Sequence, residues 1–328
     1  MPITNFPNGI SSFGVPIVGG GGSGYDFPSH GDVYFVDGTN GSDANGGKDP
    51  SDAYATIQKA VTRQIAVASG LGDVIYVLPG TYTESITGNL TNCKLIGYHP
   101  FACRVSPTDG HAYSGNLHNA MVTGFMFDNG TSTNQDYAAF RSTTIEDSVI
   151  TNCLFGKQGG EDAHSVGFMV GTYTSAATTT YFHRSIFAYN QILANGGGNT
   201  FDYGFGLCSG SGDLTNANSR TMWNSRIEHN IISGRRMGIR IIGNHNGSYG
   251  TIIRDNVIGG ATESNAETSE EGIYQYDDTS NGIGRIWILD NRISSKNDAI
   301  AGHSIQLTQG NIVAIGANGT GTPAAETA

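Results

Sequence analysis

The sequence of 328 residues predicts an all-β fold, a single-stranded right-handed parallel β-helix with an N-terminal capping α-helix and an extended N-terminal arm. The first observation is a short pattern that occurs five times in the second half, an asparagine with apolar residues three positions before it and two positions after it. The second is a short strand that follows each copy near a glycine. The third is the composition, because 48 glycines and only 14 % charged residues suit a solenoid with many tight turns.

The repeated asparagine marks one corner of each coil. Its copies are irregularly spaced but keep a fixed local pattern, which is typical of solenoid coils that share a core strand and differ in their loops. At a corner, asparagine tolerates a left-handed backbone, and its amide can hydrogen-bond the asparagine of the next coil. Two or three short strands are expected in each coil. The predicted ladder is Asn152, Asn190, Asn230, Asn256 and Asn291, and the following strands begin near Gly167, Gly204, Gly238 and Gly272.

Residues 1–30 are expected to form an extended attachment arm. The segment carries four prolines and a run of four glycines, and it cannot build a core alone. Ordering of its apolar side chains on a partner would anchor the protein. The expected contact residues are Phe6, Ile10, Phe13, Val15, Ile17 and Val18.

Residues 31–90 are expected to form the first coils. Apolar residues at helical spacing predict an amphipathic helix over about 53–69. An open solenoid end exposes unpaired backbone, so this helix is predicted to cap it. The β-helix is expected to continue over 91–310, followed by a polar C-terminal tail at 311–328.

Two stretches carry a family resemblance. The order VYFVDGTNGSDANGG, YATIQKAV and GDVIYVLPGTYTE resembles the start of the pectate-lyase-like β-helix superfamily, a fold that hosts lyases, hydrolases, epimerases and non-enzymatic virion proteins. The opening MPITNFPNGISSFGVPIVGGGG resembles the N-termini of bacteriophage virion proteins. Together they imply a virion structural protein, of the capsid decoration or head-fibre type. By the same resemblance it would be a homotrimer on the virion surface, anchored to a capsid or other virion protein by its arm.

The repeat alignment also collects candidate chemical groups. Pectate lyases of this fold use a carboxylate cluster that holds calcium and an arginine or lysine that abstracts a proton. Stacking places two aspartates one rung apart, at about the 5 Å separation of retaining glycosidases, but any stacked pair in a β-helix lies near that distance. A glutamate over an arginine is more simply a ladder ion pair worth under about 1 kcal/mol. The structural interpretation is favoured, so no catalytic group, metal or cofactor is assigned. The patch would be Glu228, His229, Arg254, Asp255 and Asp290.

Two alternatives stay open. One is a tailspike-like polysaccharide depolymerase or lyase, and the other is a non-catalytic glycan-binding virion module that binds a host-surface glycan. The net charge of −11 argues against a protein that binds nucleic-acid phosphate. The sequence shows no apolar run of membrane-spanning length and no secretion signal, so the protein is expected to be made in the host cytoplasm.

Overall fold

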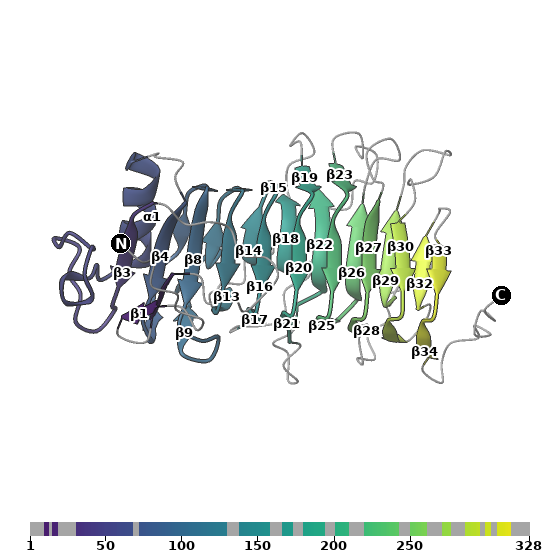
Figure 1. Cartoon of the computed structure of the whole chain (residues 1–328). Helices are drawn as coiled ribbons and strands as arrows, with labels where there is room; N and C mark the ends of the chain where they lie inside the picture. The colour runs from purple at the N-terminus through teal and green to yellow at the C-terminus, as the bar shows by residue number, and fades with distance from the viewer. Residues whose placement is uncertain are drawn as a thin grey trace.

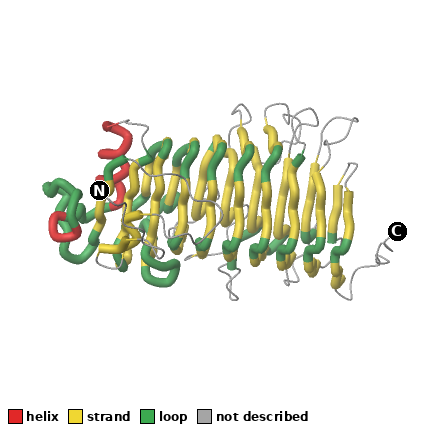
Figure 2. The backbone as a smooth tube through the Cα atoms, viewed as in Figure 1, coloured by secondary structure: helices red, strands yellow, loops and turns green. Residues whose placement is uncertain are grey.

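The chain is a right-handed parallel β-helix, with its first and last coils at opposite ends of the solenoid (Figure 1). Among the residues that the structure describes, every strand pair apart from one N-terminal hairpin is parallel and links a coil to the next one. Figure 2 shows the stacked strands in yellow. The computed structural model describes residues 10–12, 15–18, 31–67, 72–129, 138–157, 166–172, 180–193, 201–209, 220–242, 250–260, 271–276, 286–295, 299–302 and 307–315.

Four parallel sheets run along the solenoid. The ten-stranded sheet contains β3 (Val33–Val36), β4 (Asp73–Val77), β8 (Cys93–Gly97), β12 (Met121–Thr123), β16 (Val149–Thr151), β20 (Ile186–Ala188), β24 (Arg226–Glu228), β27 (Thr251–Arg254), β30 (Ile286–Leu289) and β33 (Leu307–Gln309). The nine-stranded sheet contains β5 (Gly80–Tyr82), β9 (Cys103–Val105), β13 (Met126–Asn129), β17 (Leu154–Lys157), β21 (Gln191–Ile192), β25 (Ile231–Gly234), β28 (Val257–Gly260), β31 (Arg292–Ser295) and β34 (Ile312–Ile315).

The other two sheets are shorter. The eight-stranded sheet contains β6 (Ile86–Thr87), β10 (Tyr113–Ser114), β14 (Ala138–Ser142), β18 (Val166–Thr172), β22 (Tyr203–Ser209), β26 (Met237–Ile242), β29 (Ile273–Tyr276) and β32 (Ile300–Gly302). The five-stranded sheet contains β7 (Leu90–Thr91), β11 (Leu117–His118), β15 (Thr144–Glu146), β19 (Thr180–His183) and β23 (Arg220–Trp223). The central coils therefore hold four strands each, where the sequence predicted two or three.

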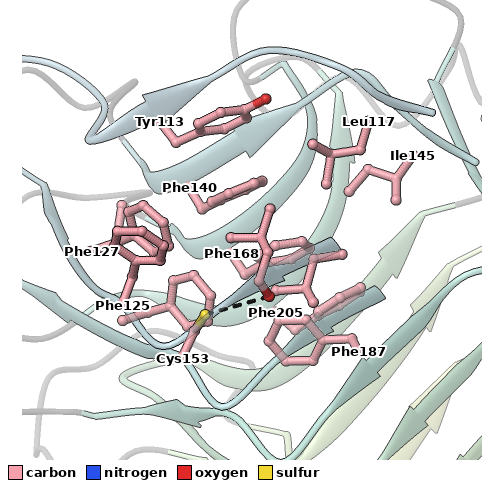
Figure 3. Close-up of a cluster of buried hydrophobic side chains, with 14 of the residues drawn as sticks. Tyr113, Leu117, Phe125, Phe127, Phe140, Ile145, Cys153, Phe168, Phe187 and Phe205 are labelled. Atoms are coloured by element: carbon pink, nitrogen blue, oxygen red, sulfur yellow. Dashed lines mark hydrogen bonds between the residues drawn. The ribbon is translucent and has the colours of Figure 1, made fainter. Parts of the chain in front are cut away.

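The core is a column of stacked side chains inside the coils. Phe140 stacks on Phe168 with ring centroids 5.0 Å apart, and Phe168 stacks on Phe205 at 5.4 Å (Figure 3). Such pairs add roughly 0.5–1.5 kcal/mol each beyond the area they bury. Because parallel strands repeat every 4.8 Å or so, an inward position in one coil lies directly over the same position in the next. Tyr113 extends the column toward the N-terminus, 4.3 Å from Phe140.

The predicted glycines lie at crowded positions that repeat from coil to coil. They face the isoleucines of the nine-stranded sheet so closely that an added Cβ would fall 2.2–2.5 Å from an isoleucine Cγ2. A side chain cannot enter that space without moving its neighbour. The pairs are Gly167 with Ile192, Gly204 with Ile232, Gly238 with Ile258, and Gly272 with Ile293.

Most of the predicted asparagine ladder is present, buried at the corner between the ten-stranded and nine-stranded sheets. In a typical rung, Asn256 Nδ2 donates to the Ile227 carbonyl and Asn256 Oδ1 accepts from the Asn230 main-chain N–H, both at 2.9 Å. Each asparagine therefore satisfies main-chain groups that the corner would otherwise leave unpaired. The ladder consists of Asn190, Asn230, Asn256 and Asn291, and Asn311 continues it beyond the prediction.

The prediction for Asn152 is wrong by one residue. The register pairs Thr151 with Ala188, so the next residue but one, Cys153, lies at the ladder position opposite Asn190. Cys153 is buried and its N–H donates to Asn190 Oδ1 at 2.9 Å, whereas Asn152 is exposed. The apolar residues on both sides of Asn152 allowed two registers, and the stacking of Ile150 on Phe187 selects the observed one.

The expected left-handed backbone also falls one residue earlier than the sequence indicated. The positive φ angles at this corner belong to the residue before each ladder asparagine, with φ between 53° and 57° at Tyr189, His229, Asp255 and Asp290. The chain turns at that residue, and the asparagine then points its amide inward. Asn152 occupies the turning position of its own coil, with φ 51°.

The first coils carry the expected helix within shorter bounds. α1 (Ile57–Val67) packs against β3, β4, β6 and β7, and its buried face joins the core through Ile57, Ala60 and Val61. Its first N–H groups are bound by the carboxylate of Glu84, which accepts from Ile57 N and Gln58 N at 2.8 Å each. Burial raises the pKa of Glu84. A short 3₁₀ helix, η1 (Pro50–Asp52), precedes α1.

The expected arm contains a hairpin. β1 (Ile10–Ser12) pairs antiparallel with β2 (Val15–Val18) in a sheet of their own, so the described part of the arm is not simply extended. Phe6 and Phe13 lie outside the described residues, as does the predicted tail after Ile315. In the part of the chain that the structure describes, no helix is long and apolar enough to cross a membrane.

Candidate functional site

The predicted charged patch forms around a buried carboxylate on the outer side of the ten-stranded sheet. Glu228 is only 1 % exposed, and Arg254 on the next strand donates Nε to Glu228 Oε2 at 2.8 Å. Arg226 Nη1 lies 3.8 Å from the other carboxylate oxygen. Two guanidinium groups therefore neutralise this carboxylate. That arrangement holds adjacent coils together and leaves little freedom for Glu228 to exchange a proton with a substrate.

The remaining predicted residues lie at the neighbouring corner. His229 Nε2 is 4.0 Å from Asp255 Oδ2, and Arg254 Nε is 3.8 Å from the same oxygen. Tyr189 stacks on the His229 ring at 5.0 Å with nearly parallel planes. Asp290 occupies the same corner position one coil further on, against Gly310. The structure thus brings Glu228, Arg254, His229 and Asp255 together.

A second cluster, which the sequence analysis missed, lies on the outer side of the five-stranded sheet. The register aligns one outward position of four successive strands, so that four polar or aromatic side chains stack in a row. We call this set the imidazole row: His118, Glu146, His183 and Trp223.

The corner that follows these strands fixes the row. Asp147 and Arg184 turn the chain with left-handed φ angles of 48° and 47°. Each is followed by a buried serine, and the Ser148 N–H donates to Ser185 Oγ at 3.1 Å. The buried serines thus form a second ladder, which fixes the register of the coils. The outward side chains are stacked as a consequence. Arg184 also pairs with Asp147 through two bonds of 2.7 and 2.8 Å beside the row.

Glu146 lies between two imidazoles. Its Oε2 is 3.2 Å from His118 Nδ1 and its Oε1 is 3.6 Å from His183 Nδ1. Its side chain is 30 % exposed, so a ligand can reach it, while His183 is 7 % exposed. Carboxylate and imidazole are the groups that most often move protons in enzymes.

His183 is enclosed on several sides. Its Nε2 is hydrogen-bonded to Thr221 Oγ1, and the ring meets the Tyr181 and Trp223 rings, each at 4.7 Å. Burial lowers the pKa of His183 to about 4, and the attraction of Glu146 only partly offsets that effect. The imidazole is therefore neutral at pH 7 and able to accept a proton.

Sequence reasoning missed this row because no single residue type occupies its position in successive coils. The asparagine pattern was visible because a buried corner demands the same residue in every coil. An outward position has no such demand, so His118, Glu146, His183 and Trp223 differ from coil to coil. The available signal was their position, since each of the last three precedes a left-handed residue and a buried serine: Glu146-Asp-Ser, His183-Arg-Ser and Trp223-Asn-Ser.

Comparison with known proteins identifies the fold. No family model matches the chain, and no curated protein matches it significantly. Among solved structures, a pectin methylesterase from carrot is 14 % identical with a TM-score of 0.53, over 89 % of this chain and 86 % of that one. A pectin methylesterase in complex with a hexasaccharide is 12 % identical with a TM-score of 0.50, over 90 % and 92 %.

A lacto-N-biosidase of family GH136 from Eubacterium ramulus is 11 % identical with a TM-score of 0.53, over 86 % of this chain and 57 % of that one. This chain therefore spans little more than half of that enzyme. Identities this low show a shared fold and nothing finer. The chain has the right-handed parallel β-helix fold that these proteins share.

Proposed function

We propose that this protein acts on a polysaccharide, as a tailspike-like depolymerase or related carbohydrate-active enzyme, and that it does so at the imidazole row. The observation that carries the proposal is the reachable Glu146 carboxylate between two imidazoles, with a partly exposed tryptophan in the same row. An aromatic ring offers a flat apolar face for a sugar ring, and the carboxylate and imidazoles offer proton transfer beside it. That several proteins of the same fold act on carbohydrate supports the substrate class.

The row suits an extended ligand. Its four residues belong to four successive coils, so they repeat along the solenoid at about 4.8 Å per rung. A polymer lying along this side of the solenoid could contact one outward side chain of the imidazole row in each successive coil. By contrast, the Glu228 patch is a weaker candidate, because its carboxylate is already occupied by two arginines.

The test is binding to a panel of bacterial surface polysaccharides, pectin and alginate, followed by an assay for released reducing ends. The chain contains two tryptophans, which provides a matched pair of variants. Trp223→Ala should weaken binding at least tenfold. Trp287→Ala removes a 44 % exposed tryptophan from the ten-stranded sheet and should leave binding unchanged. Equal losses in both variants, or no binding of any polysaccharide by the wild type, would contradict the proposal.

Attachment to a virion through the arm is a second proposal, compatible with the first. It is favoured by the hairpin of β1 and β2, which forms a sheet separate from the four solenoid sheets and contains Ile10, Val15, Ile17 and Val18. Deletion of residues 1–24 should leave the body folded and abolish binding to particles. Light scattering should give about three times 34.5 kDa if the chain is a homotrimer, and a stable monomer would refute that assembly.

A further inference from the structure

Thr221, two residues before Trp223, forms a relay with His183 and Glu146 of the imidazole row. The Thr221 hydroxyl is hydrogen-bonded to His183 Nε2, and His183 Nδ1 faces Glu146 Oε1 at 3.6 Å. When the hydroxyl donates to Nε2, the ring proton is on Nδ1 and points toward the carboxylate. Covalent catalysis by a hydroxyl requires that the hydroxyl be activated. An adjacent base does this when a third group orients that base. The distance to Glu146 is long, as such contacts often are without substrate.

We propose that Thr221, His183 and Glu146 form a nucleophile, a general base and an orienting carboxylate that hydrolyse acyl esters. The substrate class is an O-acylated polysaccharide, and this part alone rests on the function proposed above. The relay itself requires only an ester of a carboxylic acid.

The reaction balances without a metal or a redox partner. Thr221 Oγ attacks the acyl carbonyl carbon while its proton passes to His183 Nε2. The tetrahedral intermediate then expels the sugar oxygen, which takes the proton from His183 and leaves as an alcohol. Water next attacks the acyl-threonine, giving its proton to His183, and release of the carboxylic acid restores the Thr221 hydroxyl. Glu146 stabilises the imidazolium that forms in each half.

The surroundings of His183 fit this role. The low exposure of the ring keeps it neutral at rest, and the nearby charged groups are Glu146, Asp147 and Arg184. The second oxygen of Glu146 is 3.2 Å from His118 Nδ1, which fixes the carboxylate in place. Thr221 and Trp223 are themselves only partly buried, so the solenoid surface is open beside the relay.

The experiment uses the full chain with p-nitrophenyl acetate, a small ester that carries no sugar, and a fluorophosphonate probe with peptide mapping. Wild type should hydrolyse the ester and carry the probe on Thr221. Thr221→Val should lower kcat at least about a hundredfold and prevent labelling, because the nucleophile is absent. Thr144→Val is the matched control. Thr144 lies two coils earlier in the same outward row as Thr221, and its loss should leave kcat unchanged.

Glu146→Gln tests the positioning role. It should lower kcat with little change in KM, because the acyl group does not bind to the carboxylate. Absence of esterase activity and of Thr221 labelling in the folded wild type would overturn the relay, as would equal losses in the two threonine variants. Polysaccharide binding that depends on Trp223 without esterase activity would leave the proposed function standing and remove the relay. Esterase activity without polysaccharide binding would support the relay and contradict the proposed function.

Discussion

Removing one rung of the asparagine ladder should destabilise the solenoid well beyond the loss of a surface contact. In Asn256→Ala, the Asn230 main-chain N–H loses its acceptor at 2.9 Å and the Ile227 carbonyl loses a donor at 2.9 Å. Asn256 is only 1 % exposed, so water cannot replace either bond. A buried group left without its partner costs about 1–3 kcal/mol. Two such groups give an expected loss of about 2–6 kcal/mol in the free energy of unfolding.

The assay is urea unfolding followed by far-ultraviolet circular dichroism, with unfolding rates in concentrated urea as a second measure. Asn311→Ala is the control, because Asn311 is itself only half-buried in the last described coil, so water can enter the space that its side chain leaves. It should cost less than half as much as Asn256→Ala. A loss below about 1 kcal/mol for Asn256→Ala, or equal losses for the two variants, would refute the reasoning that the ladder satisfies buried main-chain groups.

Three further predictions concern two buried positions of the coils and the titration of His183. Gly238→Ala should cost about 1–3 kcal/mol by overpacking, since the new Cβ would lie 2.3 Å from Ile258 Cγ2. Gly259→Ala is the control and should be tolerated, because its Cβ would meet nothing closer than 3.8 Å. Thermal unfolding of the two variants measures the difference. Cys153→Asn should keep or raise the unfolding free energy in urea, because its amide would face the Val122 carbonyl that Cys153 Sγ now approaches at 3.9 Å; a loss above about 2 kcal/mol would contradict this. Burial holds the pKa of His183 near 4, below its ordinary 6.5. The unfolded chain therefore binds the extra proton between those values, and the urea midpoint should fall as the pH drops from 6.5 to 4; His183→Gln should flatten that slope, and an unchanged slope would refute it.

Much of the fold could be predicted because inward positions repeat. A buried corner needs a side chain that bonds main-chain groups, which explains Asn190, Asn230, Asn256 and Asn291. A crowded strand start needs the absence of a side chain, which explains the glycines that face the isoleucines. The same reasoning failed at Asn152, where two registers satisfied the apolar pattern, and the stacking of Ile150 on Phe187 selected the one that puts Cys153 at the ladder position.

The sequence by itself determined the parallel β-helix, its ladder and its N-terminal helix, because packing and main-chain hydrogen bonding impose the same residues on every coil. Only the tertiary structure decided which outward side chains meet. Loops of unequal length separate His118, Glu146, His183 and Thr221, and no packing rule repeats at their positions. Strand register alone brings His118, Glu146 and His183 into one row and places Thr221 beside it. Burial then lowers the pKa of His183 and leaves it as a neutral base beside a hydroxyl.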